Sequence, residues 1–398
     1  MIVETVPPLG PLLAETAAEP PDGPLTVGDE RVRDFLAALS KRLLDPARAR
    51  LHPELAALGF FLRRGELNRL GSFTDPGGVL RHPRGLVLHF PPANVDTVFV
   101  YSWALSALAG NANIVRLSAR GGPATGAILD ALRETDAHPA IARTQRLVSY
   151  DRSDEITAAL SLACDLRVIW GGDSSVEGLR RFPLRPSARD LAFPDRSSFA
   201  AVSSGAWAAA GPAERRRAAD AFVTDSYWFD QAACSSPRTV FWVGGGSAGD
   251  RTEFCALVDE AAAARGFTTD AAMAVQKRVA AYGMAAEGAA DSLRFHGNGL
   301  AAIGLTDPGR LPRHWLGAGA FAHTEVPGLA SLIPRLTRKD QTLSVYGFDA
   351  AELHAFAAAA GGRGIDRIVP FGSALSFAPV WDGYDLLHEF TRLVTVRV

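Results

Sequence analysis

The sequence has few cysteines and a net charge close to zero, and each of these features excludes a class of protein. Cys164, Cys234 and Cys255 are an odd number without a C-x-x-C pair, so they form neither a disulfide framework nor a cysteine zinc site. The 41 basic and 43 acidic side chains give a net charge of -2, which provides no field to attract nucleic acid or an anionic membrane surface. We expect no metal and no nucleic-acid partner.

Long apolar runs and a secretory leader pattern are also missing. The first 24 residues are rich in proline, glutamate and alanine, where a leader would carry basic residues and then an apolar run. Because they show no clear period, we expect an irregular arm. The least polar stretch, 98–109, is too short to span a bilayer and predicts a buried helix. These features predict a cytoplasmic protein without a membrane span.

The sequence does contain a regular alternation of short apolar strands and helices. At 398 residues with 47% apolar side chains, the chain is too long for one ordinary core, so we expect two domains. Behind Asp29, helical spacing of apolar residues predicts a first packed helix, with Val32, Phe35, Leu36, Leu39 and Leu43 on one face. Strands are expected at 85–90, 114–117, 146–150 and 166–170, with helices at 96–109, 123–135, 153–163 and 174–181. This alternation predicts an α/β fold with a doubly wound, mostly parallel Rossmann-type sheet.

A second α/β domain is expected after the Pro- and Arg-rich passage 182–194. The alternation resumes at Ser198, with a helix over 213–229 and a strand over 239–243. We expect residues 1–194 to form the first domain and residues 195–363 the second. The last segment, 364–398, ends in apolar residues suited to pairing, so it should return to the first domain or to an oligomer interface.

The glycine-rich loop 244–249 offers a weak dinucleotide site. Gly244, Gly246 and Gly249 match G-x-G-x-x-G, but this fingerprint needs an acid at the end of the next strand. Asp259 and Glu260 instead fall inside the expected helix 252–264. A flexible surface turn is the better interpretation.

The same loop matches the serine hydrolase pattern G-x-S-x-G through Ser247. Asp382 or Asp385 and then His388 follow in hydrolase order. A loop so rich in glycine would hold the serine loosely, and a nucleophile must be held rigidly. A serine hydrolase is therefore not the preferred interpretation, but it remains an alternative.

Cys234 is a third candidate. Cys164 and Cys255 lie in helical patterns beside Leu162 and Phe254, as small buried apolar residues do. Cys234 lies in a polar loop closed by a proline, where backbone amides can point at a reachable thiol. This setting favours a nucleophile and a buried apolar residue equally.

Five segments, which occur along the chain in the same order as in the family, resemble the LuxC-type acyl-CoA reductases, which share the aldehyde dehydrogenase fold. They are Phe229-Asp-Gln-Ala-Ala-Cys-Ser-Ser-Pro237, Gly110-Asn-Ala-Asn-Ile-Val-Arg-Leu-Ser118, Val168-Ile-Trp-Gly-Gly172, Gly364-Ile-Asp-Arg-Ile-Val-Pro370 and Trp381-Asp-Gly383. The resemblance implies an oxidoreductase that reduces a thioester to an aldehyde with NADPH. It implies that Cys234 attacks the acyl carbonyl and expels the carrier thiol. It also implies that Asn94 stabilises the oxyanion, although a turn or helix N-cap would explain this asparagine equally well.

The resemblance also implies a cofactor site. Arg116, Ser118 and Arg120 lie where such folds contact the adenine ribose, and Ala119 replaces the glutamate that favours NAD. Two guanidinium groups without that acid suit a 2′-phosphate and predict NADPH, unless these arginines are simply exposed strand ends.

Two further parts of the cofactor site follow from the same resemblance. Gly171 and Gly172, with Ser174 at the start of a helix, should lie against the pyrophosphate. Glu325 is a weaker candidate for the nicotinamide ribose, with a surface acid as its alternative.

One departure favours reduction over oxidation. Hydrolytic aldehyde dehydrogenases carry a glutamate about 34 residues before the cysteine to activate water. Ala200 stands there, and only Asp195 is near. Phe193 and Asp195 also differ from the glycine and lysine expected in the family.

These observations predict a cytoplasmic, NADPH-dependent acyl thioester reductase of the aldehyde dehydrogenase fold. Its substrate would be an acyl-CoA or an acyl-carrier-protein thioester, and a homodimer is expected. A serine hydrolase acting through Ser247 and a non-catalytic homologue that binds acyl carriers remain alternatives.

Overall fold

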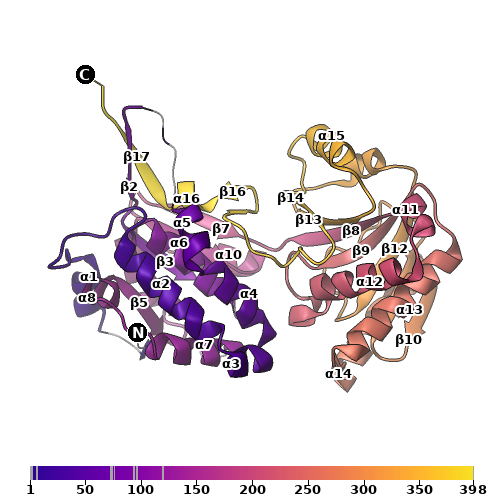
Figure 1. Ribbon diagram of the computed structural model, residues 1–398, viewed down its shortest axis with the longest axis horizontal. Helices are drawn as coiled ribbons and strands as arrows, with labels where there is room; N and C mark the ends of the chain where they lie inside the picture. The colour runs from indigo at the N-terminus through magenta and orange to yellow at the C-terminus, as the bar shows by residue number, and fades with distance from the viewer. Residues whose placement is uncertain are drawn as a thin grey trace. The chain divides into compact units, whose positions relative to one another are not determined.

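The computed structural model describes residues 3–5, 8–71, 75, 77–92, 95, 97–118 and 121–397. The chain forms two compact units (Figure 1): one holds residues 1–194 and 377–398, and the other holds residues 195–376. The segment 364–398 is therefore divided between them. Within the described ranges, every helix is too short or too polar to cross a lipid bilayer.

The first unit is built on a sheet whose paired strands all run parallel. Its order within the described residues is β1-β5-β4-β3-β6-β7, so the order reverses between β3 and β6. The strands are β1 (Val3–Thr5), β3 (Leu86–Phe90), β4 (Ala112–Leu117), β5 (Gln145–Ser149), β6 (Leu166–Trp170) and β7 (Arg189–Phe193). The predicted doubly wound fold is confirmed.

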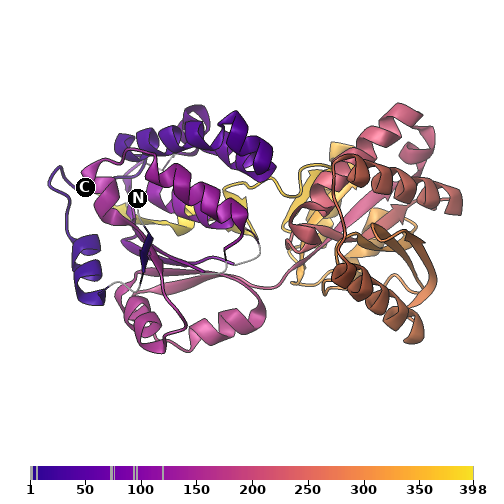
Figure 2. The same ribbon diagram turned by 90° about the horizontal axis from the view of Figure 1, so that it is seen from below.

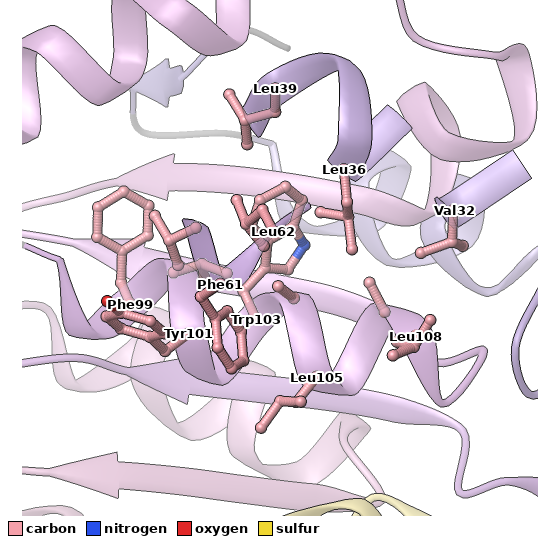
Figure 3. Packing of buried hydrophobic residues seen from close by; sticks show 14 of the residues in the cluster. Val32, Leu36, Leu39, Phe61, Leu62, Phe99, Tyr101, Trp103, Leu105 and Leu108 are labelled. Carbon is pink, nitrogen blue, oxygen red and sulfur yellow. The ribbon is translucent and has the colours of Figure 1, made fainter. Parts of the chain in front are cut away.

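Helices cover both faces of this sheet (Figure 2). On one face, α2 (Glu30–Leu43) and α6 (Val98–Leu108) share a core with Val87 of β3. Figure 3 shows side chains of α2, such as Leu36, pointing toward Trp103 of α6. All five apolar residues predicted on the first helix are buried. Further helices of this unit are α3 (Pro46–Leu51), α4 (Pro53–Phe61), α5 (Arg64–Leu70), α7 (Pro123–Arg133), α8 (Pro139–Thr144), α10 (Asp173–Arg180) and α16 (Leu386–Glu389).

The N-terminal arm predicted to be irregular contains a strand and a helix, and of its described part the end, 18–24, is irregular. Its residues form β1, which pairs in parallel with β5, and α1 (Leu9–Ala17), which packs with α9 (Asp154–Ala163) on the second face. α1 has nine residues, and only Leu12 and Thr16 are buried. So few buried positions do not reveal a helical period of apolar residues in the sequence. Arg146 of β5 binds both Glu4 and Glu15, and these ion pairs fix the segment through contacts distant in sequence.

The second unit has a mixed sheet of order β10-β11-β12-β9-β8-β13-β14 within the described residues. Only β10 and β11 pair antiparallel there. The strands are β8 (Ser197–Ser203), β9 (Pro237–Val243), β10 (Ala290–His296), β11 (Leu300–Leu305), β12 (Ala320–Val326), β13 (Asp340–Tyr346) and β14 (Arg367–Pro370). One face packs on α11 (Ser204–Ala209), α12 (Pro212–Ser226) and α13 (Ala248–Ala264), and the other on α14 (Ala271–Ala286), η2 (Leu329–Arg335) and α15 (Ala350–Ala360).

The C-terminal strand pairs within the first unit. β17 (Thr391–Thr395) runs antiparallel to β2 (Val79–Pro83), and a short pair, β15 (Val380–Trp381) and β16 (Tyr384–Asp385), precedes it. Leu80 and Leu393 on the β2/β17 pair are 53% and 54% exposed. The predicted apolar C-terminal strand thus finds a strand partner in its own chain while leaving apolar side chains in solvent.

A chain of buried hydrogen bonds crosses the core of the first unit. Trp170 Nε1 donates to Ser102 Oγ, which lies 3.0 Å from Nδ1 of His89. His89 Nε2 lies 2.9 Å from Asn113 Oδ1, and Asn113 donates to the amide oxygen of Gln145. Because an amide oxygen only accepts, His89 donates through Nε2 and accepts through Nδ1, as a neutral ring does. Burial lowers the pKa of His89 to about 4.

We expect the substitution His89→Gln to weaken the dependence of stability on pH. Above about pH 6.5 the ring is neutral in both states. As the pH falls from there toward 4, the unfolded chain binds a proton that the buried ring does not, so the wild type loses stability. At about pH 5 this loss is about 2 kcal/mol, and the variant should escape it.

Urea unfolding near pH 7 and near pH 5 measures this difference. The exposed His354, replaced in the same way, is the control and should behave as the wild type does. Equal acid losses in all three proteins would contradict the assignment of a neutral, buried His89.

Candidate active site

Most of the residues predicted to bind the cofactor lie on neighbouring strands of the first sheet or directly after them. Ser118 follows β4 and Gly171 follows β6, and β3 lies between these strands. Carboxyl ends of parallel strands beside a reversal of strand order form the crevice in which such sheets bind ligands. Asn94 and Arg120, predicted at the same edge, lie outside the described residues.

The glycine turn after β6 begins α10. The N–H of Gly171 donates to the carbonyl of Phe193 at 3.1 Å, and a Cβ at this glycine would lie 3.3 Å from the Cβ of Ser175. Gly172 is the N-cap of α10, and Ser174 is exposed in the first turn. A helix that starts at the end of a strand presents its free N–H groups there, which suits an anionic ligand.

Arg116 lies on β4 close to its carboxyl end. Its Nη2 donates to the carbonyl of Tyr150 at 3.1 Å, and its guanidinium carbon lies 5.3 Å from the centre of the Tyr150 ring. These contacts hold the side chain beside the end of β5. Among the described residues the guanidinium makes no ion pair, so it has donors left for a ligand.

The backbone before Cys234 is strained. Phe229, Asp230 and Gln231 have φ values of 53°, 53° and 58°, in the left-handed region that L-residues avoid. Trp315 Nε1 donates to the carbonyl of Asp230 at 2.9 Å. Consecutive left-handed residues persist only where their surroundings hold them.

The side chain of Gln231 forms hydrogen bonds that hold these left-handed residues in place. It is 1% exposed, and its Nε2 donates to the carbonyls of Pro237 and Ala320 at 2.8 and 3.1 Å. Its Oε1 accepts from the N–H of Gly319 at 2.8 Å. One amide thereby ties the loop to the amino ends of β9 and β12.

Cys234 lies at the corner of a tight turn at the amino end of β9. The N–H of Ser236 donates to the carbonyl of Ala233 at 3.0 Å and closes the turn around Cys234. Ser198 Oγ donates to the carbonyl of Cys234 at 2.7 Å and accepts from the N–H of Thr342 at 3.1 Å. The cysteine backbone is therefore fixed to the starts of β8 and β13.

The three cysteines have different surroundings. Cys164 and Cys255 are 0% and 3% exposed, and burial raises the pKa of each to about 12. Cys234 is half-buried. Of the three cysteines, it alone keeps partial exposure to solvent.

The position where a water-activating glutamate was sought is apolar. Ala200 is 0% exposed within β8, and it pairs with Val240 of β9 and Ser344 of β13. Asp195, the nearby acid, is exposed ahead of β8.

The other two candidates have structural partners. Glu325 is exposed on β12 and forms an ion pair with Arg251. Ser247 is the N-cap of α13: its hydroxyl donates to the Asp250 carboxylate at 2.7 Å and accepts from the Asp250 N–H at 3.0 Å. The predicted surface turn is thus a capping box, which gives no support to a serine nucleophile.

The residues that hold this site were not predicted from the sequence. Gln231 lies inside the motif that contains Cys234, so its position could have drawn attention. Ser198 and His89 carry no such signal, because their partners lie 36 and 24 residues away.

Comparisons with known proteins agree with the sequence motifs. A family model described as acyl-CoA reductase (LuxC) matches residues 64–273. A long-chain acyl-protein thioester reductase of Photorhabdus luminescens is 24% identical over 335 residues, which cover 81% of this chain and 65% of that protein. A second such reductase, from Photobacterium leiognathi, is 24% identical over 41% of this chain and 33% of its own length. The chain thus spans less than two thirds of these relatives.

Solved structures share the fold. An NAD-dependent aldehyde dehydrogenase from Sinorhizobium meliloti matches 98% of this chain and 86% of its own, with a TM-score of 0.71 and 12% identity. A lactaldehyde dehydrogenase matches 98% of this chain and 90% of its own, with a TM-score of 0.66 and 14% identity. The predicted aldehyde dehydrogenase-like fold is confirmed.

We expect Gln231→Ala to lower the free energy of unfolding by about 2–4 kcal/mol, because two buried carbonyls and one N–H lose their partner. Urea unfolding measures this loss. Gln276→Ala on the exposed side of α14 is the matched control and should change stability by less than about 0.5 kcal/mol. A loss as small as that of the control would show that Gln231 does not hold the loop.

Proposed function

Because the chain belongs to the acyl-CoA reductase (LuxC) family, a family of aldehyde-forming oxidoreductases, we propose that it reduces an acyl thioester to an aldehyde through an acyl intermediate on Cys234. The observation that carries this proposal is the setting of Cys234. Its backbone is tied down by hydrogen bonds while the residue stays partly exposed, as a nucleophile requires.

The reaction would proceed in two stages. The Cys234 sulfur attacks the acyl carbonyl, the bond to the carrier sulfur breaks, and the carrier leaves as a thiol after taking up a proton. NADPH, when bound, supplies a hydride to the acyl carbon. The resulting thiohemiacetal then loses its bond to Cys234, which releases the aldehyde and restores the free cysteine. Backbone N–H groups of the Cys234 loop, with Asn94, would stabilise the oxyanion.

The lack of a water-activating acid favours this outcome over hydrolysis. Ala200 offers no proton acceptor at the position of the glutamate in hydrolytic aldehyde dehydrogenases, so water lacks that base for attack on the acyl-cysteine. The intermediate then lasts long enough for reduction. The alternative of a non-catalytic acyl-carrier-binding homologue does not explain why this thiol alone is left accessible.

The cofactor would bind at the edge where β4, β3 and β6 end. The glycine turn with Gly171, Gly172 and Ser174 at α10 suits the pyrophosphate, and Arg116 has donors for the 2′-phosphate of NADPH. Ser118 and Arg120 would lie near the adenosine. Glu325 is the weakest member of the set, because Arg251 already binds it.

The thioester donor would be acyl-CoA or a carrier protein, in keeping with the acyl-protein substrates named for the curated relatives. We also propose a homodimer, because the β2/β17 pair exposes Leu80 and Leu393.

Cys234→Ala should abolish aldehyde formation, with a loss of more than about 10³-fold in the rate of NADPH oxidation by acyl-CoA or acyl-carrier-protein. Incubation of the wild type with an acyl thioester should add one acyl mass to the peptide that contains Cys234. Cys255→Ala, which removes a buried thiol from the same unit, is the control and should keep both signals. A label on Ser247, or turnover by Cys234→Ala, would overturn the proposal.

Arg116→Glu should weaken NADPH binding about 10–100-fold and NADH binding far less, because a charge-assisted contact to the 2′-phosphate is lost. Titration of cofactor fluorescence measures both dissociation constants. Arg50→Glu makes the same charge change at an exposed site on α3 and serves as the control. Equal losses for the two cofactors would remove Arg116 from the phosphate site.

A further inference from the structure

A buried guanidinium lies four residues after Cys234. Arg238 is on β9, and the side chain is only 7% exposed. Its Nη1 donates to the carbonyl of Arg313. Its Nε is buried without a hydrogen-bond partner, and among the described residues Arg238 forms no ion pair with a carboxylate.

Such a group is costly to bury. A cation removed from water is destabilised by several kcal/mol unless an anion or several acceptors replace the water. One backbone carbonyl does not replace a carboxylate. A buried and incompletely paired arginine therefore suits a negative charge that forms beside it during function.

Cys234 can supply that charge. The turn closed by Ala233 and Ser236 leads directly into β9, so Cys234 and Arg238 belong to one short connection at the same edge of the sheet. Burial lowers the pKa of Arg238, and negative charge on Cys234 and then on Asp195 raises it again. The anionic form of Cys234 and the cationic form of Arg238 thus favour each other.

The other charged groups near this edge have their own contacts. Arg313 donates to both carboxylate oxygens of Asp340, at 2.8 and 2.9 Å, and Arg196 pairs with Asp366. The remaining ionisable side chains on the adjoining segments are Asp195, Asp230, His314 and Lys339. Asp340 is consequently engaged by Arg313, and the carboxylate that acts on Arg238, after Cys234, is the exposed Asp195.

We propose that Arg238 is a positioning residue that holds Cys234 as a thiolate at neutral pH. This inference rests on the proposed function, since it assigns a role only if Cys234 is the nucleophile. The same charge would help the last step, because a thiolate stabilised by Arg238 leaves the thiohemiacetal more readily.

The pH dependence of Cys234 alkylation tests the proposal. Iodoacetamide reacts with the thiolate, and mass spectrometry follows the peptide that contains Cys234. The wild type should show a midpoint well below that of a free cysteine, about 8.5. Arg238→Gln should raise the midpoint by more than about one pH unit, and Arg238→Lys should raise it less, because lysine keeps the charge.

Arg335→Gln is the matched control. The Arg335 guanidinium also donates to a backbone carbonyl, that of Ser331, and also has a buried Nε without a partner. It lies in η2, so its loss should leave the midpoint unchanged. A midpoint in Arg238→Gln equal to that of the wild type would overturn the proposal.

A measurement on the wild type covers the case in which Arg238→Gln does not fold. The thiolate absorbance near 240 nm, taken as the difference between wild type and Cys234→Ala across pH, gives the same midpoint. A value at or above about 8.5 would overturn the role of Arg238. Acyl labelling of Cys234 tests the proposed function separately, since labelling with an ordinary midpoint leaves the function standing and removes only Arg238.

Discussion

The geometry of Cys234 depends on one buried amide. Gln231 binds Pro237, Ala320 and Gly319, and these bonds hold a loop in which three successive residues have positive φ. Each left-handed residue costs about 1–2 kcal/mol, so without its partners the loop would relax toward ordinary backbone conformations. The turn at Ala233–Ser236 would then lose its register with β9. A partly exposed cysteine on a fixed backbone is the consequence of these hydrogen bonds.

The two sheets place their polar residues at opposite ends. In the first sheet, the glycine turn and Arg116 lie at the carboxyl ends of parallel strands, beside the reversal of strand order. In the second sheet, Cys234, Ser198 and Arg238 lie at the amino ends of β8 and β9. Strand topology therefore explains where a cofactor can bind. The cysteine site instead depends on the side chains of Gln231 and Ser198, which form hydrogen bonds with backbone groups of the loop and of the neighbouring strands.

This contrast explains how far the sequence could be interpreted. Helix α2 was predicted because its apolar side chains recur at the helical period, and strands β3 to β6 were predicted because each is a short apolar run. β1 and α1 were missed because their stability comes from β5 and from Arg146, more than 100 residues away. Cys234 was recognised through its motif. The groups that hold it were not, because hydrogen bonds between distant segments leave no local pattern in a single sequence.

The motif Gly110–Ser118 resembles the family's cofactor site, but its two asparagines have a structural role. Asn111 accepts from the N–H groups of Arg84 and Gly85 and donates to the carbonyl of Phe390, and Asn113 joins His89 to Gln145. Both asparagines are 0% exposed, so they contact no ligand. They fix the strand that carries Arg116, and through Ser102 the same hydrogen bonds reach Trp170, next to Gly171. A motif shared with a family can thus mark the support of a site as well as its contacts, and the mutation of a buried member would affect ligand binding only through stability and strand position.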